Sequence, residues 1–233
     1  MDIECLSKQS KSVSLHIFMS YPRITNNQAE RVSRSVTFSN IKHIFSLGTK
    51  AVLDVGCSEG YYLRHFGEGS VGVTIIADHV EIARDHGLNV VLKNVEDSDF
   101  SLHKTFDAIW ANNFFEHLNA PHSFLMRMRD HSSQDGILIL GVPVIPYFSW
   151  LTYFKKFRGA YAVSHVNFFT RNTLIETVKA AGWLVIQARP FYVKNTIIDS
   201  VFNLIAPHIY VIAIPKKDFV YPQKRLMSLE GYN

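Results

Sequence analysis

The chain has 233 residues, of which 47% are hydrophobic and 19% charged, with a formal net charge of +4 at pH 7. This apolar content excludes a mainly disordered chain, and so small and scattered a charge is not the basic stripe of a nucleic-acid-binding protein. The cysteines, Cys5 and Cys57, are too few and too far apart for a disulfide framework or a cysteine-based zinc site. Asp2 and Glu4 precede any apolar run, which is not typical of a signal peptide. We therefore expect a protein of the reducing cytoplasm.

Apolar runs and helical patterns alternate along most of the chain, after a region at 1–24 without a clear period that we expect to form a surface arm. Strands alternating with helices predict a doubly wound α/β fold, a mostly parallel seven-stranded sheet with helices on both faces. We expect one domain, 1–233. The expected strands are 51–55, 70–75, 88–93, 107–111, 136–142, 183–188 and 209–214, and the expected helices are 27–47, 61–66, 78–86, 121–131, 171–181 and 196–204.

Residues 136–154 carry no charged side chain and are followed by a basic cluster that includes Lys155 and Lys156, so by length alone they resemble a membrane span. Pro143 and Pro146 interrupt this stretch. A strand at 136–142 that is buried on both faces needs no charge, because helices cover it. We therefore expect a buried strand followed by a separate aromatic segment.

Two glycines follow the first expected strand in the run Asp54-Val55-Gly56-Cys57-Ser58-Glu59-Gly60. Glycine lets the backbone turn sharply and approach a ligand closely. The Gly-x-x-x-Gly spacing fits neither a dinucleotide fingerprint nor a P-loop. Because ligands of such sheets bind beyond the carboxyl ends of the strands, this turn predicts a nucleotide-like ligand held without a pyrophosphate grip.

Four blocks, in order, resemble class I S-adenosylmethionine-dependent methyltransferases. The run 52–60 resembles their first motif, 106–118 the fourth-strand block ending in Glu-His, and 136–143 the fifth strand. The block from His165 to Trp183 is similar to the ubiquinone-type small-molecule O-methyltransferase branch. The resemblance covers about 50–190 and implies a Rossmann-like methyltransferase fold, S-adenosyl-L-methionine as cofactor and a methyl-transferring enzyme.

The resemblance also implies roles for individual residues. Asp54, Gly56 and Gly60 would hold the methionine part of the cofactor, while Cys57 and Ser58 would line the turn. The remaining implied cofactor-binding positions are Thr74 for the ribose, Asn94, Val95 and Glu96 for the adenine, and Asn112 near the methyl donor. Thr74 stands where the family normally has an acid, and a hydroxyl cannot offer a bidentate charge-assisted pair. Asp78 is a candidate to assist it, and loss of catalysis in a methyltransferase-like binding or partner module is the alternative.

Methyl transfer to an oxygen of high pKa benefits from a positioned base, and His117 and His165 are the catalytic candidates. The competing interpretation is that His117 packs structurally and His165 only orients its loop. In the ubiquinone branch the block Glu-x-x-Glu-His is linked to metal dependence, but Asn113 replaces the first acid here. We therefore expect no required metal. Five further histidines are expected to be solvated: His79, His86, His103, His122 and His131.

Residues 147–161 are rich in aromatic side chains and carry three cations near their end. If the segment is helical, Tyr147, Trp150, Leu151, Phe154 and Phe157 share one apolar stripe. The stripe either packs over the pocket, forms a lid for an apolar or lipid-linked acceptor, or touches a membrane interface.

These features together divide the expected domain into an N-terminal arm and helix (1–48), a cofactor-binding core (49–143), a lid or acceptor segment (144–170) and the C-terminal part of the sheet (171–233). We expect O-methylation of a small molecule, either a glycan or sugar intermediate or an apolar or lipid-linked acceptor. A nucleic-acid substrate is not expected, because Asn112-Asn113-Phe114-Phe115 lacks the prolines typical of base-amino methyltransferases. The oligomeric state stays open.

Overall fold

The computed structural model describes residues 27–223 and Met227. The expected N-terminal arm, 1–24, lies outside the described residues. Seven strands form the main sheet in the order β3-β2-β1-β4-β5-β8-β7. The strands are β1 (Val52–Val55), β2 (Val71–Thr74), β3 (Val90–Leu92), β4 (Phe106–Asn112), β5 (Ser132–Ile145), β7 (Trp183–Arg189) and β8 (His208–Pro215).

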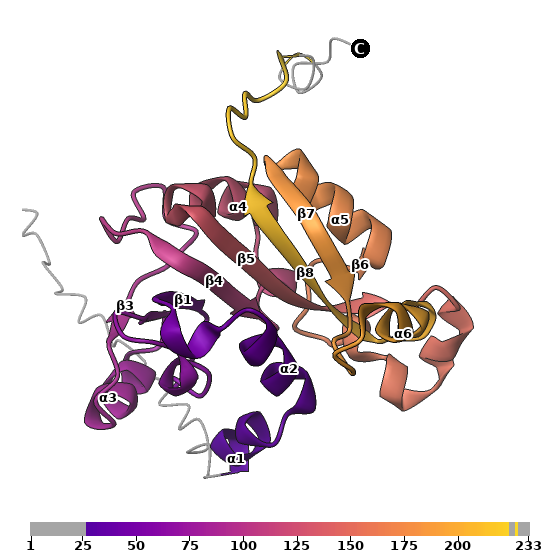
Figure 1. Cartoon of the computed structure of the whole chain (residues 1–233), viewed down its shortest axis with the longest axis horizontal. Helices are drawn as coiled ribbons and strands as arrows, with labels where there is room; N and C mark the ends of the chain where they lie inside the picture. Colours follow the sequence, from indigo (N-terminus) through magenta and orange to yellow (C-terminus); the bar gives the residue numbers. More distant parts are fainter. Residues whose placement is uncertain (1–26, 224–226, 228–233) are drawn as a thin grey trace, which may run out of the picture.

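Strands β1 to β5 are parallel neighbours, and β8 runs antiparallel to both β5 and β7. The neighbouring strands β4, β5, β8 and β7 form the long diagonal of Figure 1. The prediction of a doubly wound, mostly parallel seven-stranded sheet is confirmed. One short strand was not expected: β6 (Phe169–Thr170) pairs with the end of β5, where Val144 is opposite Phe169.

Six α-helices accompany the strands, and short 3-10 turns fill several connections. The helices are α1 (Asn27–Ser33), α2 (Val36–Ile44), α3 (Ala77–Asp85), α4 (Pro121–Asp130), α5 (Arg171–Ala180) and α6 (Thr196–Val201). The 3-10 turns are η1 (Leu47–Thr49), η2 (Leu63–His65), η3 (Phe115–His117), η4 (Ser149–Tyr153), η5 (Lys155–Phe157), η6 (Gly159–Tyr161) and η7 (Phe202–Leu204).

Two helix predictions were wrong in detail. The expected helix at 27–47 is divided into α1 and α2, because Ser35 adopts an extended conformation and its hydroxyl accepts a hydrogen bond from the backbone N–H of Phe38 at 3.2 Å. This is an N-cap, which starts a new helix. The expected helix at 61–66 is only the turn η2. In contrast, the helix expected at 171–181 forms as α5, and Thr170 caps it through a reciprocal box with Thr173.

The core has two layers because successive strand residues point to opposite faces of the sheet. On one face Leu53, Ile109 and Leu140 join a cluster with Phe124 of α4 and Leu174 of α5. On the other face the cluster contains residues of the same strands and of α2: Val52, Ala108, Trp110, Ile139 and Ile41. Helices therefore cover both faces of the sheet. The centre of β5 carries no charged side chain.

The uncharged stretch 136–154 separates as expected into the interior of β5 and a turn-rich segment after Pro146. No helix among the described residues is long and apolar enough to cross a membrane. The aromatic segment is not a regular helix but three successive 3-10 turns, so its side chains do not share a single stripe.

Candidate active site

The turn after β1 lies at the topological switch point of the sheet. β1 pairs with β2 on one side and with β4 on the other, so the connections leaving their carboxyl ends diverge. Gly56, Ser58 and Gly60 all have positive φ angles, of 70°, 51° and 79°. This left-handed geometry is easy for glycine and costly for residues with a Cβ. The sequence Asp54–Gly60 thus folds into the tight, open-backbone turn that the glycine spacing predicted.

Two buried polar oxygens near this turn have no hydrogen-bond partner within the protein: Oδ2 of Asp54 and Oδ1 of Asn112. Burial raises the pKa of the Asp54 carboxyl well above its ordinary value, although a backbone hydrogen bond at Leu63 partly offsets this. Such orphaned oxygens are costly unless something donates to them. An amino group on a ligand is the chemistry that they lack.

Tyr62 is a residue of this site that the sequence argument missed. Its hydroxyl accepts a hydrogen bond from the Asn112 side-chain amide at 3.1 Å. Burial and the charge of Asp54 raise the pKa of Tyr62 to about 12, so the phenol stays protonated. The ring packs at 4.9 Å from Phe38 and 5.1 Å from Trp110, which fixes its position.

A cavity of about 280 Å³ opens beside the turn. Seven of the predicted site residues line it: Gly56, Ser58, Thr74, Asn94, Val95, Glu96 and His117. Ile75, Ile76, His79, Lys93, Phe114 and Leu118 also line it, none of which was predicted as a site residue. The ends of β1, β2 and β3 and the turn after β4 are therefore brought together as the resemblance implied.

The other predicted residues lie outside the lining of this cavity. Asp54 is buried at the end of β1, and Cys57 packs beneath the turn, where its sulfur would lie 2.6 Å from a Cβ placed on Gly72. Burial and the Asp54 charge raise the pKa of the Cys57 thiol, so it is an inert packing group. Gly60 and Asn112 contribute a turn and a buried amide, and His165 belongs to a separate cluster.

Thr74 and Glu96 already have partners inside the protein. The Thr74 hydroxyl accepts from the backbone N–H of Ile76 at 3.3 Å. The Glu96 carboxylate accepts from Asn119 at 3.0 Å and from the backbone N–H of Ala120 at 2.7 Å, immediately before α4. Glu96 thus fastens the loop after β3 to the start of α4. Asp78 is exposed on α3, whereas its neighbour His79 lines the cavity.

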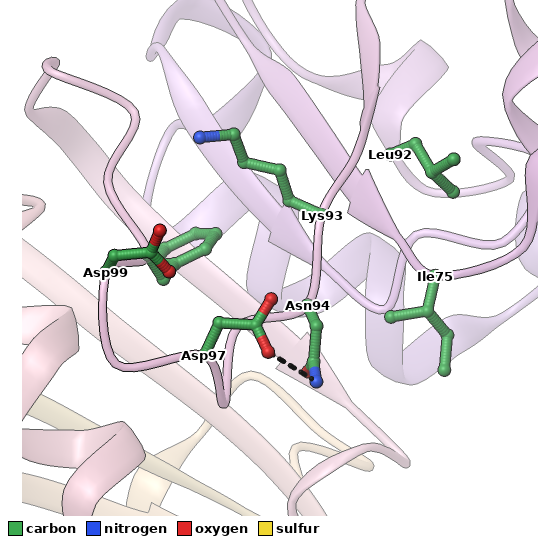
Figure 2. Close-up of a pocket in the computed structure, with 7 residues that line it drawn as sticks. Ile75, Leu92, Lys93, Asn94, Asp97 and Asp99 are labelled. Atoms are coloured by element: carbon green, nitrogen blue, oxygen red, sulfur yellow. Dashed lines mark hydrogen bonds between the residues drawn. The ribbon is translucent and has the colours of Figure 1, made fainter.

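A second cavity of about 370 Å³ adjoins the first and shares Ile75, Lys93 and Asn94 with it. Figure 2 shows the Asn94 and Asp97 side chains pointing toward each other, joined by a hydrogen bond of 3.1 Å. This larger cavity does not include the glycine turn or the predicted catalytic residues. The smaller cavity is therefore the better candidate for the site of chemistry.

Glu116 lies between the two predicted catalytic histidines. Its Oε1 is 3.8 Å from Nε2 of His165 and 3.9 Å from Nε2 of His117. The two imidazole rings meet edge to face with centroids 4.7 Å apart. Glu116 is 1% exposed, and burial raises its pKa. Glu116 was not predicted as a site residue, because its burial depends on a segment that is distant along the chain.

Three of the five histidines expected to be solvated are not: His79, His122 and His131. His122 is half-buried, and its Nε2 lies 3.1 Å from the Tyr221 hydroxyl. His131 is buried, and its Nε2 accepts a hydrogen bond from the backbone N–H of Leu102 at 3.2 Å. His79 lines the cavity and lies 3.5 Å from the Ser58 hydroxyl. The Oδ1 atom of Asn113, which stands in place of the family's first acid, lies 2.9 Å from Nε2 of His208.

Comparison with known proteins decides the family. The family described as "Methyltransferase domain" matches residues 29–188, which is more than half of the chain. The chain belongs to the methyltransferase-domain family. A curated relative, the ubiquinone biosynthesis O-methyltransferase of Glaesserella parasuis serovar 5 (strain SH0165), is 29% identical over 104 residues, covering 39% of this chain and 44% of that protein. The chain therefore matches less than half the length of this relative.

Solved structures of methyltransferases share the fold. An S-adenosylmethionine-dependent methyltransferase from Clostridium acetobutylicum ATCC 824 aligns with a TM-score of 0.60 at 10% identity, covering 82% of this chain and 96% of that one. The plantazolicin methyltransferase BpumL, solved with a monoazolic desmethylPZN analogue and SAH, aligns with a TM-score of 0.57 at 13% identity, covering 82% and 87%. At such identities these likenesses support the fold of a class I methyltransferase.

S-adenosylmethionine is the cofactor of this methyltransferase domain, and the residues present fit it. The positive φ angles of Gly56 and Gly60 leave the backbone of the turn accessible to a ligand beside β1. Oδ2 of Asp54 and Oδ1 of Asn112 have no hydrogen-bond donor among the described residues. The methionine part of the cofactor carries an ammonium group that can supply one. Ile75 and Val95 offer apolar contacts at the cavity for an adenine ring.

Proposed function

We propose that this methyltransferase domain transfers the methyl group of S-adenosylmethionine to an oxygen of a small molecule. The observation that carries the proposal is the pairing of a cofactor cavity at the glycine turn with an imidazole, His117, in its wall. The alternative, a methyltransferase-like module without catalysis, rested on Thr74 in place of an acid. The Thr74 hydroxyl accepts one hydrogen bond, from the N–H of Ile76, and keeps its proton and a second lone pair for a ribose hydroxyl.

The transfer itself needs alignment more than activation. As the acceptor oxygen forms its bond to the methyl carbon, the carbon–sulfur bond breaks and its electron pair returns to sulfur, which becomes a neutral thioether. The acceptor's proton must leave at the same stage. We propose that His117 and His165, on the acceptor side, promote the removal of this proton. Phe114 and Leu118 form apolar walls of the cavity that limit the access of water.

The proposal is tested first by binding and then by transfer. Titration of the protein with S-adenosylmethionine or S-adenosylhomocysteine in a calorimeter should show one site per chain. Labelled methyl from the cofactor should then be incorporated into a small molecule of fractionated extract. Absence of cofactor binding at high concentration would instead favour the non-catalytic module.

His165→Ala should lower turnover by about 100-fold or more while changing cofactor affinity by less than about threefold, because removing a group that handles the acceptor's proton typically costs 10²–10⁴ in rate. His165 lies outside the lining of the cofactor cavity, and its side chain is only 9% exposed. Steady-state rates and calorimetric titration of the same preparation measure the two effects. Unchanged turnover would remove His165 from the mechanism.

For the acceptor we propose an apolar or lipid-linked molecule ahead of a glycan or sugar intermediate. Several large side chains of the segment after β5 are exposed: Tyr147, Phe148, Trp150, Tyr153 and Phe154. Three cations follow, and no acidic residue occurs between Asp135 and Glu176. Pro207, just before β8, accepts a hydrogen bond from the N–H of Val144 of β5, which brings the preceding helix α6 to this end of the sheet. Ile197 and Val201 of α6 are exposed there. We also propose a cytoplasmic location for the protein.

If this surface also meets a membrane, the protein should co-sediment with liposomes containing anionic lipid, and a Trp150→Ala/Phe154→Ala variant should lose most of that binding. Aromatic side chains favour the interfacial region of a bilayer, and cations are attracted to anionic lipids. Since both rings are more than half exposed, their removal should leave the fold unchanged. Absence of binding by the wild-type protein would restrict the segment to a role over the acceptor.

A further inference from the structure

Three potential metal-ligating side chains converge beside the cofactor cavity: Glu116, His117 and His165. One ligand atom from each lies within 4.8 Å of the others. Two of these residues belong to the turn η3 after β4, and the third comes from the segment that returns toward β6. This segment is held in place because the backbone N–H groups of Val166 and Asn167 both donate to the carbonyl of Glu116, at 3.1 and 3.0 Å. The cluster is thus fixed by the backbone.

The hydrogen bonds of the two rings determine which nitrogen is free. Nδ1 of His117 lies 2.9 Å from the carbonyl of Ser164, and Nδ1 of His165 lies 3.2 Å from the carbonyl of Ala160. A carbonyl only accepts, so each Nδ1 must carry the proton. In the neutral ring Nε2 then presents its lone pair, and both Nε2 atoms lie near the same oxygen of Glu116. A backbone carbonyl on the second nitrogen is the usual support of a metal-bound histidine.

The carboxylate of Glu116 is the third candidate ligand. Both oxygens of Glu116 are buried, and neither has a hydrogen-bond partner within the protein. The distances of 3.8 and 3.9 Å to the imidazole nitrogens are too long for hydrogen bonds. Two ligands about 2.1 Å from one ion at a tetrahedral angle would be about 3.4 Å apart. Each Glu116–imidazole distance must therefore contract by about 0.5 Å, and the two imidazole nitrogens, which lie within 4.8 Å of each other, must approach by at most about 1.4 Å. A cation between the three atoms would give the carboxylate and both Nε2 lone pairs a partner.

We propose that Glu116, His117 and His165 bind a divalent transition-metal ion of the zinc class. Two imidazoles and one carboxylate favour such an ion over Mg²⁺, which prefers oxygen ligands and retains its waters. This set is not the Glu-x-x-Glu-His block, because Asn113 points to His208 and the third ligand is His165, which lies outside that block. The expectation of no required metal was based only on the replacement of the family's first acid by Asn113.

Three protein ligands leave coordination positions open, and His117 is in the wall of the cavity. A divalent ion lowers the pKa of an oxygen bound to it. On the proposed function, the two histidines would then promote loss of the acceptor's proton by holding the ion. This role rests on the proposed function, whereas the binding of the ion does not.

The test uses the full chain without an affinity tag, stripped with a chelator and dialysed. Calorimetry with Zn²⁺ should show one site per chain, and added Co²⁺ should give the visible absorption of a four- or five-coordinate ion. Glu116→Gln and His117→Asn should each weaken Zn²⁺ binding by at least about tenfold. His86→Ala, which removes an exposed imidazole from the end of α3, should bind Zn²⁺ as the wild type does.

S-adenosylhomocysteine titration of the same samples separates this inference from the proposed function and reports folding. Cofactor binding without Zn²⁺ binding, or Zn²⁺ binding that is unchanged in both Glu116→Gln and His117→Asn, would overturn the metal site alone. Loss of Zn²⁺ binding in the folded His117→Asn variant, whose side chain is 38% exposed in the wild type, would support it even if Glu116→Gln fails to fold.

Discussion

Gly56→Ala should weaken cofactor binding by at least about tenfold, and Gly87→Ala should leave it within about twofold of the wild type. Both glycines have left-handed backbone angles, φ 70° and 74°, so alanine incurs a similar conformational cost at each. Only at Gly56 does the new methyl group meet another residue, because its Cβ would lie 2.4 Å from Cδ2 of Phe114. Around Gly87 no atom other than those of the glycine and its two chain neighbours lies within 4 Å of that position.

The difference between these two variants isolates the cavity from the backbone. Phe114 lines the cavity, so the methyl group at position 56 would push its ring toward the cofactor or open the turn. Calorimetric titration with S-adenosylhomocysteine measures the effect, and thermal melts confirm folding. The double variant Gly56→Ala/Phe114→Ala should recover part of the affinity. Equal affinities of the Gly56→Ala and Gly87→Ala variants would contradict this account of the turn.

Asp199→Ala should lower the free energy of unfolding by about 3–5 kcal/mol, which is the usual cost of leaving one member of a buried ion pair alone. Asp199 is fully buried, and its carboxylate accepts from Arg189 at 2.9 Å and from the backbone N–H groups of Phe191 and Val193 at 2.8 and 2.9 Å. Arg189 is 2% exposed. Its guanidinium group would lose its only buried countercharge among these contacts.

The matched control is Glu176→Ala, which removes an ion pair with Lys179 of similar length, 2.8 Å, on the exposed surface of α5. Exposed pairs contribute about 0–1 kcal/mol. Urea unfolding followed by tryptophan fluorescence measures both variants. A loss below about 1 kcal/mol for Asp199→Ala would mean that the connection between β7 and α6 does not depend on this pair.

The strands were predictable because each is a short apolar run bounded by turn residues. Such runs are typical of strands that are buried on both faces of a sheet. The helix expected at 61–66 failed for a physical reason. Tyr61 and Leu63 are buried in different clusters, and six residues cannot pay the cost of helix nucleation without a continuous packed face. The pairing of β6 with β5 could not be predicted, since a strand of two residues is too short to show an alternation of apolar and polar side chains.

The cofactor side of the site was more visible in the sequence than the acceptor side. The glycine turn is local, so Asp54–Gly60 indicates its own geometry. Glu116 and Tyr62 matter because of what distant segments do to them: the first is buried by the returning chain near His165, and the second is fixed by Asn112 and aromatic neighbours. No spacing along the chain reports such contacts.

The pairing of β5 with β6 has a consequence for how this protein can change. The connection from Ile145 to Phe169 starts and ends on adjacent hydrogen-bonded strands, and its last residues are tied to the Glu116 carbonyl. The part before Ala160 can therefore vary in length and composition without moving either anchor, whereas His165 is held by the carbonyl of Ala160 beside Glu116. On the proposed function, exchange of residues 147–158 by grafting should alter acceptor preference while the cofactor cavity, which none of these residues lines, stays unchanged.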